Sequence, residues 1–180
     1  MGPAVFLDRD GTIIFDNGYL KDTSQVILFP ETLIALKKLQ SYFKLFIITN
    51  QSGISKGLTT QEEVDNVNNY LKALLKASGI DILEIFVCSH QTEEACICKK
   101  PSAYFIHLAE KIYDLNLSES FIIGDHPTDI ECGHNASVKG IYVLTGHGQK
   151  HINELKENTI ICDNILLAAD YIINNKKNGI

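Results

Sequence analysis

The sequence lacks an excess of basic residues, which disfavours nucleic acid as its main partner. Its 180 residues hold 16 Lys and Arg against 22 Asp and Glu, a net charge of −6, and no basic block. It also lacks a charged-then-apolar leader and any apolar run of about 18 residues, the length that crosses a bilayer. We therefore expect a cytoplasmic protein with neither a nucleic-acid nor a membrane partner.

Apolar residues are plentiful, at 45% of the chain, enough for the core of one domain spanning residues 1–180. Short apolar runs alternate with helical patterns, and no connection has room for a second, lid-like domain. This arrangement predicts an α/β fold with a mainly parallel sheet covered on both faces, whose ligands bind at the carboxyl ends of the strands. The expected strands are residues 4–7, 45–49, 82–88, 121–124, 141–144 and 159–162, and the expected helices are 30–42, 60–78, 101–114, 128–136 and 164–174.

Two carboxylates follow the first apolar run. Asp8 and Asp10 flank Arg9, so an extended backbone would point both toward one site. Converging carboxylates repel each other unless a cation lies between them, and ligation by oxygen alone favours Mg²⁺. An acidic turn with a structural role only is the alternative.

Polar turns follow two further segments. The second expected strand ends in hydroxyl and amide side chains that could bind a phosphoryl group: Thr49, Asn50, Gln51 and Ser52. A polar turn without a function is the alternative. The stretch Asp16-Asn17-Gly18-Tyr19 suggests a short hairpin or flap with an Asn-Gly turn.

A cysteine- and histidine-rich loop spans residues 88–98. Three thiols and one imidazole make the Cys₃His set of a closed, structural Zn²⁺ site, and buried or redox-active cysteines are the alternative. The ligands are expected to be Cys88, His90, Cys96 and Cys98.

Lys99, Lys100 and Pro101 come directly after this loop. We expect Pro101 at the first position of the next helix. The two lysines lie beside the acidic site and are expected to bind phosphate, with solvated surface charges as the alternative.

A third acidic stretch repeats the strand–glycine–carboxylate pattern. Asp125 follows Gly124 and is expected to complete the magnesium site. Asp129 is expected either to cap the next helix or to support the metal site indirectly. His126 faces the site by its position, or makes local hydrogen bonds. The glycine-rich turn at 144–148 ends another strand, where it could line the site, but we assign it no role.

Together these stretches resemble the motifs of the haloacid dehalogenase superfamily phosphatases: Asp8-Arg9-Asp10-Gly11-Thr12, Thr49-Asn50-Gln51-Ser52-Gly53, a lysine, and Gly124-Asp125 with Asp129. The resemblance implies that Asp8 is the nucleophile and forms an aspartyl-phosphate, and that Asp10 is the general acid and base. It implies Mg²⁺ held by Asp8, the Asp10 carbonyl and Asp125, with Thr49 and Lys100 stabilising the phosphoryl charge.

When the cysteine-rich loop is considered together with these motifs, the chain resembles the zinc-containing D-glycero-D-manno-heptose 1,7-bisphosphate 7-phosphatases and their histidinol-phosphate phosphatase relatives. This implies a Rossmann-like three-layer sandwich without a cap domain, which removes the 7-phosphate of the bisphosphate. Lys99 and Lys56 stand where Arg is usual. The implied substrate-binding residues are Asp16, Asn17, Gly18, Tyr19, Asn50, Gln51, Ser52, Lys99 and His126.

Several alternatives remain open from sequence. Histidinol phosphate is the rival substrate, and a zinc-stabilised binding module with an inactive phosphatase fold is the rival class. The acidic composition counts against a DNA 3′-phosphatase. We expect a monomer that acts on a small phosphorylated sugar or a related metabolite.

Overall fold

The computed structural model describes residues 2–177 and places six strands in one sheet with the order β3-β2-β1-β4-β5-β6. Every neighbouring pair is parallel. The α/β prediction is confirmed, and the strand order, which the hydrophobic pattern could not supply, has its switch point between β1 and β4. A crevice at the carboxyl ends of the strands is expected there. The strands are β1 (Ala4–Leu7), β2 (Lys44–Asn50), β3 (Ile82–Cys88), β4 (Phe121–Gly124), β5 (Lys139–Val143) and β6 (Ile160–Cys162).

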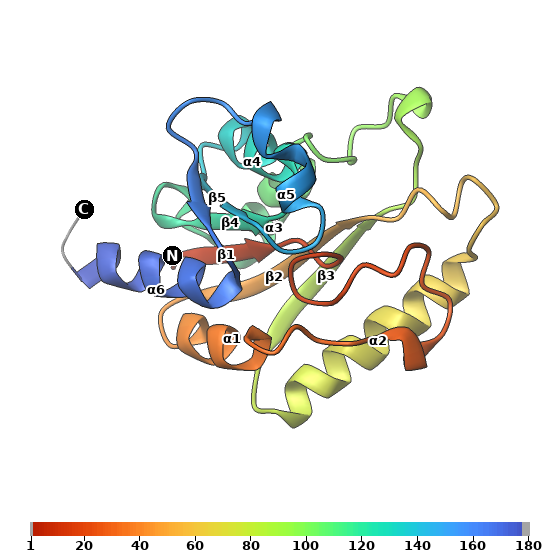
Figure 1. Cartoon of the computed structure of the whole chain (residues 1–180), viewed down its shortest axis with the longest axis horizontal. Coiled ribbons are helices and arrows are strands. Elements are labelled where there is room, and N and C mark those ends of the chain that lie inside the picture. The colour runs from red at the N-terminus through yellow and green to blue at the C-terminus, as the bar shows by residue number, and fades with distance from the viewer. Residues whose placement is uncertain (1, 178–180) are drawn as a thin grey trace.

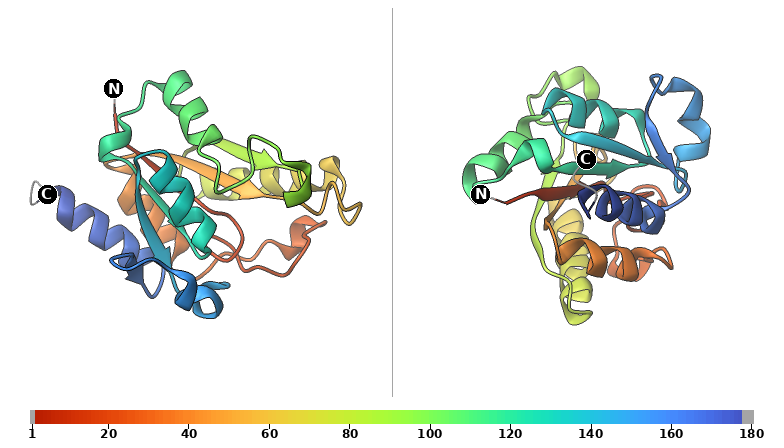
Figure 2. Two further views of the ribbon diagram at one scale, coloured as in Figure 1. Left: turned by 90° about the horizontal axis from the view of Figure 1, so that it is seen from above. Right: turned by 90° about the vertical axis from the view of Figure 1, so that its left-hand side faces the viewer.

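Helices cover both faces of the sheet, with α1, α2 and α6 on one side and α3 and α4 on the other (Figures 1 and 2). The five expected helices are present with ends shifted by a few residues, and the short α5 was not predicted. None of the helices formed by residues 2–177 is long and apolar enough to cross a membrane. The helices are α1 (Thr32–Gln40), α2 (Gln61–Ala77), α3 (Tyr104–Tyr113), α4 (Pro127–Asn135), α5 (Gly148–His151) and α6 (Ile165–Lys177).

The central strand β1 is buried on both faces, which explains its unbroken apolar sequence. Val5 and Leu7 pack in the cluster with α1, α2 and α6, whereas Ala4 and Phe6 pack in the cluster with α3 and α4. Leu7 is in register with Ile47 of β2 and Ile123 of β4. From this level β4 continues for one residue and β2 for three, so the polar residues at the ends of the three strands gather at the same edge of the sheet.

Helix α2 begins with a capping box between Thr60 and Glu63. Its buried stripe is apolar except for one residue, Asn68, which is 6% exposed. Such a position requires a polar partner inside the protein, and that partner, Arg9, belongs to the site.

The prediction for Pro101 was wrong. Helix α3 begins at Tyr104 rather than at Pro101, and the Lys100–Pro101 peptide bond is cis. Asn50 fixes the Lys100 backbone through two hydrogen bonds, one to its N–H (3.1 Å) and one to its carbonyl (3.3 Å). These bonds tie the segment to the end of β2, so the helix starts only after it.

The flap, residues 11–30, folds back on itself as expected, but not through an Asn-Gly hairpin turn. Phe15 N donates to Ile27 O (2.9 Å) and Phe29 N donates to Ile13 O (3.1 Å). The loop between these bonded segments is much longer than two residues. Gly18, with φ of +85°, instead donates its N–H to Asp16 at the tip of the flap.

Candidate active site

The flap, the turn after β2 and the cysteine-rich loop all extend beyond the same end of the sheet (Figure 1). There the cysteine-rich loop and the residues at the ends of β1, β2 and β4 line a cleft of about 510 Å³. Its lining includes Asp8 and Asp10 after β1, Asn50 at the end of β2, Lys100, and Asp125 after β4. The topology therefore brings together residues that are far apart in the sequence.

Lys100 lies at the bottom of this cleft as a buried cation, 4% exposed. Its Nζ donates to Asp8 Oδ1 (2.5 Å), Asp129 Oδ1 (2.6 Å) and Ile48 O (3.0 Å), which uses all three ammonium protons. Burial acts to lower the pKa of Lys100, but Asp129 and Asp8 outweigh it and raise that pKa. The ammonium group is thus permanently charged and fixed in place.

Three carboxylates crowd around this lysine: oxygens of Asp8, Asp125 and Asp129 lie within 4.8 Å of one another. Burial raises the pKa of Asp8 well above its usual value, although Lys100 opposes the shift. Burial, and to a smaller extent the negative charge of Asp129, raise the pKa of Asp125 to about 6. One ammonium does not balance three buried carboxylates, so a divalent cation with oxygen ligands fits here.

Asp125 is held by the neighbouring turns. It accepts hydrogen bonds from the His147 N–H (2.7 Å) and from Thr12 Oγ1 (3.4 Å). Gly11 and Gly146 approach it so closely that a Cβ on either would lie 2.2 Å from Asp125 Oδ2. The glycine-rich turn to which the sequence assigned no role thus shapes the acidic site.

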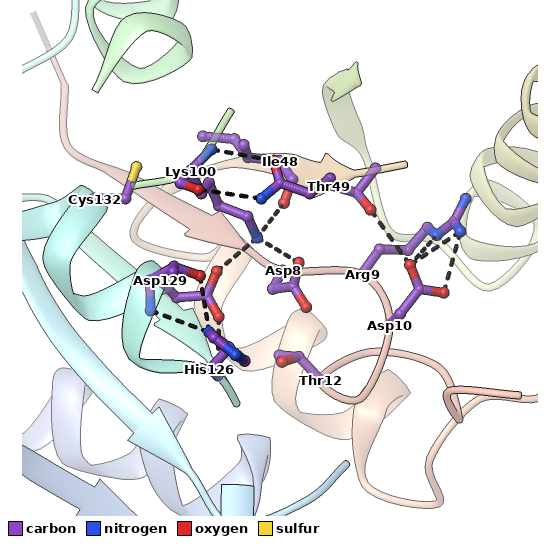
Figure 3. Close-up of polar contacts among 12 residues, drawn as sticks. Asp8, Arg9, Asp10, Thr12, Ile48, Thr49, Lys100, His126, Asp129 and Cys132 are labelled. Carbon is purple, nitrogen blue, oxygen red and sulfur yellow. Dashed lines mark hydrogen bonds and ion pairs between the residues drawn. The ribbon is translucent and has the colours of Figure 1, made fainter. Parts of the chain in front are cut away.

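Asp10 faces a different direction from Asp8 (Figure 3). Arg9 donates to both of its carboxylate oxygens, from Nε to Oδ2 (3.0 Å) and from a terminal nitrogen to Oδ1 (3.1 Å). Gln51 (2.8 Å) and Thr49 (3.3 Å) also donate to Oδ2. β1 ends at Leu7, so the strand alternation that was expected to align Asp8 with Asp10 does not extend to them, although both line the cleft.

His126 and Asp129 form the N-terminal capping box of α4. The His126 N–H donates to Asp129 Oδ2 (3.0 Å), and the His126 ring accepts from Thr128 N (3.3 Å). Asp129 therefore both caps a helix and binds Lys100. His126 lines the cleft while making local hydrogen bonds, and burial lowers the pKa of its imidazole.

A smaller hollow of about 330 Å³ lies between the flap and the turn after β2. Lys56 Nζ donates to the Tyr19 hydroxyl (3.2 Å), which joins these two walls. Asn17 is exposed and lines neither hollow. The lining residues are Asp10, Asp16, Gly18, Tyr19, Asn50, Gln51 and Ser52.

His147 and Arg9 are site residues that the sequence analysis missed. His147 lines the larger cleft, and its Nε2 hydrogen-bonds to Asp16 Oδ2 of the flap (2.9 Å). Its only signal in the sequence is its place in a glycine-rich turn after a strand. Arg9 shows no signal beyond its position between two aspartates.

The cysteine-rich loop gathers its four candidate ligands, Cys88, His90, Cys96 and Cys98, into one cluster. Its sulfur–sulfur distances are 3.6, 3.3 and 3.7 Å, and Nδ1 of the histidine lies 3.7 and 3.5 Å from two sulfurs. Tetrahedral Zn²⁺ with Zn–S bonds of about 2.3 Å holds its sulfur ligands about 3.7 Å apart. The cluster is compatible with zinc.

The thiols of this cluster differ in acidity. Burial raises the pKa of Cys88 to about 12. Burial acts in the same direction on Cys96, but backbone hydrogen bonds from Cys98 and Lys99 outweigh it and lower that pKa to about 7. Lys99 Nζ also donates to the His90 carbonyl (3.2 Å), so the loop and the first of the two lysines are joined.

Comparison with known proteins gives several matches. Residues 97–168 match the HAD-hydrolase-like family model. The chain is 36% identical over 171 residues to a D-glycero-beta-D-manno-heptose-1,7-bisphosphate 7-phosphatase of Helicobacter pylori, covering 94% of this chain and 96% of that protein. It is 35% identical over 143 residues to a histidine biosynthesis bifunctional protein of Blochmanniella floridana, covering 76% of this chain but 40% of that one.

Among solved structures, the fold matches a D,D-heptose 1,7-bisphosphate phosphatase from B. bronchiseptica complexed with magnesium and phosphate. The TM-score is 0.88 at 26% sequence identity, and the match covers 96% of this chain and 99% of the other. The similarity extends over nearly the whole length of the sequence and of the fold. The chain belongs to the haloacid dehalogenase-like hydrolases and, within them, to the D-glycero-D-manno-heptose-1,7-bisphosphate 7-phosphatase family.

Proposed function

We propose that this protein is a magnesium-dependent phosphomonoester hydrolase that acts through an aspartyl-phosphate on Asp8. One observation carries the proposal: Asp8 lies at the bottom of an open cleft, bonded to the fixed cation Lys100 and crowded by Asp125 and Asp129. No hydrogen bond to its second oxygen, Oδ2, is found within residues 2–177, so Asp8 can present this oxygen to phosphorus as a nucleophile.

The residues divide the reaction into two steps. Asp10 enters the reaction protonated and gives its proton to the leaving oxygen while the Asp8 carboxylate attacks phosphorus; it then takes a proton from the water that hydrolyses the acyl phosphate, which restores Asp8 as a carboxylate and Asp10 as the acid. Lys100 and the Thr49 hydroxyl stabilise the charge on the phosphoryl oxygens. Asp8, Asp125 and the Asp10 carbonyl would hold magnesium, which would supply positive charge to neutralise the phosphoryl group.

For the substrate we propose a heptose 1,7-bisphosphate, which loses its 7-phosphate. The name of the Helicobacter pylori relative supports this substrate. The shape of the site supports it too. Asp10 and Asn50 line both the cleft and the smaller hollow, so the two hollows adjoin and suit a substrate that extends beyond the phosphate that it loses. Lys99 lines the cleft beside the cysteine-rich loop, where its charge suits the second phosphate.

Initial rates with heptose 1,7-bisphosphate and histidinol phosphate, measured side by side with magnesium and zinc-replete protein, test the substrate. Histidinol phosphate is the right comparison because one relative is named for histidine biosynthesis. We expect kcat/KM to be at least about 100-fold higher for the bisphosphate, a difference of about 3 kcal/mol. Equal values, or a preference for histidinol phosphate, would overturn the substrate assignment and leave the reaction standing.

We also propose that Cys88, His90, Cys96 and Cys98 bind one structural zinc ion. Cys98→Ser is then expected to lose the ion and about 3–4 kcal/mol of unfolding free energy, because a ligand held only by the folded state stabilises it by that amount at 100–1,000 times its Kd. The measurements are zinc content by elemental analysis and the thermal midpoint. Cys162→Ser, outside the cluster, is the matched control. If wild-type protein from cells grown in zinc-containing medium contains no zinc after purification, the proposal is contradicted.

A further inference from the structure

Arg9 is the largest fully buried side chain among the described residues, at 1% exposed, and the reaction above gives it no role. Burying a guanidinium group is costly unless its donors are paired. Here Nε and one terminal nitrogen bond to Asp10, and the other terminal nitrogen donates to Asn68 Oδ1 (2.7 Å). At this exposure Arg9 does not reach a substrate, so its role acts through Asp10.

Asn68 fixes the far end of the guanidinium group. It is the one polar residue in the buried stripe of α2, between Val67 and Leu71. No other hydrogen bond to its side chain is found within residues 2–177. Helix α2 thus holds the arginine from one side while Asp10 holds it from the other, and the planar group has one orientation.

The site contains two separate ion-pair groups (Figure 3). Lys100 pairs with Asp8 and Asp129, and Arg9 pairs with Asp10. The forked contact to both oxygens keeps Asp10 at the junction of the cleft and the smaller hollow, with its side chain 18% exposed.

We propose that Arg9, anchored by Asn68, is a positioning residue that orients the Asp10 carboxyl group, which transfers its proton to the leaving oxygen and takes one back from the hydrolytic water. This rests on the proposed function, in which Asp10 is the general acid. A sugar alkoxide needs that proton in order to leave, whereas p-nitrophenolate is stable without it. Misplacing Asp10 should therefore slow hydrolysis of the sugar phosphate far more than hydrolysis of p-nitrophenyl phosphate.

The test compares Asn68→Leu and Arg9→Lys with wild type on both substrates. The leucine extends the apolar stripe of α2 and removes the anchor, whereas the lysine keeps the charge and removes the fork. We expect kcat on heptose 1,7-bisphosphate to fall about 10- to 100-fold and kcat on p-nitrophenyl phosphate to fall less than about 3-fold, since general acid catalysis contributes about 10²–10⁴-fold. KM for the bisphosphate should stay near the wild-type value.

Lys72→Met, on the same helix and bonded to the Leu83 carbonyl away from the site, is the matched control and should leave both rates unchanged. If Arg9→Lys fails to fold, Asn68→Leu decides. A parallel loss on both substrates in folded protein, or no loss on either, overturns the positioning role. The proposed function fails separately, if Asp8→Asn keeps wild-type activity on both substrates.

Discussion

Asp8→Asn is expected to abolish phosphate release, with a loss of about 10⁴-fold or more, while leaving the protein folded. The amide has nearly the shape of the carboxylate but is a very poor nucleophile, so no acyl phosphate forms. Lys100 keeps its bonds to Asp129 and to the Ile48 carbonyl, and one of the crowded negative charges is removed. We therefore expect the unfolding free energy to stay within about 1 kcal/mol of wild type or to rise.

The measurements are initial rates of phosphate release with magnesium and urea unfolding of the same preparations. Asp65→Asn is the matched control, because Asp65 is an exposed aspartate on α2 whose carboxylate accepts a hydrogen bond from Gln61 of the same helix. It should behave as wild type in both assays. An Asp8→Asn protein that keeps a tenth of the wild-type rate would exclude Asp8 as the nucleophile.

Lys100→Met is expected to impair both activity and stability. Methionine fills much of the same volume but leaves Asp8, Asp129 and the Ile48 carbonyl without the ammonium that they share. Removing one partner of a buried ion pair costs about 3–5 kcal/mol, and losing a fixed charge from the phosphoryl site costs about 10²–10³-fold in kcat.

Urea unfolding of zinc-replete Lys100→Met in magnesium-free buffer and in saturating magnesium measures this cost. We expect the loss of stability to be larger without magnesium, because a bound cation would offset part of the unbalanced charge. Lys99→Met is the matched control: Lys99 bonds to the His90 carbonyl outside the carboxylate cluster, so its loss should raise KM for the bisphosphate and leave stability nearly unchanged. Equal stability of Lys100→Met and wild type in the magnesium-free buffer would contradict the buried ion-pair account.

The parts of the fold that depend on local pattern could be predicted from the sequence. The short apolar runs predicted the strands correctly because β1 and its neighbours are buried on both faces. The single turn α5 was missed because four residues are too few for a helical pattern. Pro101 was misplaced because Asn50, fifty positions away from Lys100, holds that segment against β2, and nothing in the local sequence shows that contact.

The candidate site divides in the same way. Parallel strands end at one edge of a sheet, so the sequence sufficed to place Asp8, Asp10, Asn50 and Asp125 around one cleft. The pairing of their side chains could not be inferred. Arg9 meets Asn68 across 59 positions and His147 meets Asp16 across 131, and both contacts depend on how helices and loops pack around the sheet.

Trapping the covalent intermediate is the most direct test of the central claim, that phosphoryl transfer passes through Asp8. Wild-type enzyme is mixed with a stoichiometric amount of heptose 1,7-bisphosphate and magnesium, quenched in acid within one turnover, and reduced with borohydride, which converts an acyl phosphate to an alcohol. Peptide mass spectrometry then locates the reduced residue. We expect homoserine at position 8 and none in Asp8→Asn. Phosphate release without reduction at Asp8, or reduction at Asp10 or Asp125 instead, would contradict the account.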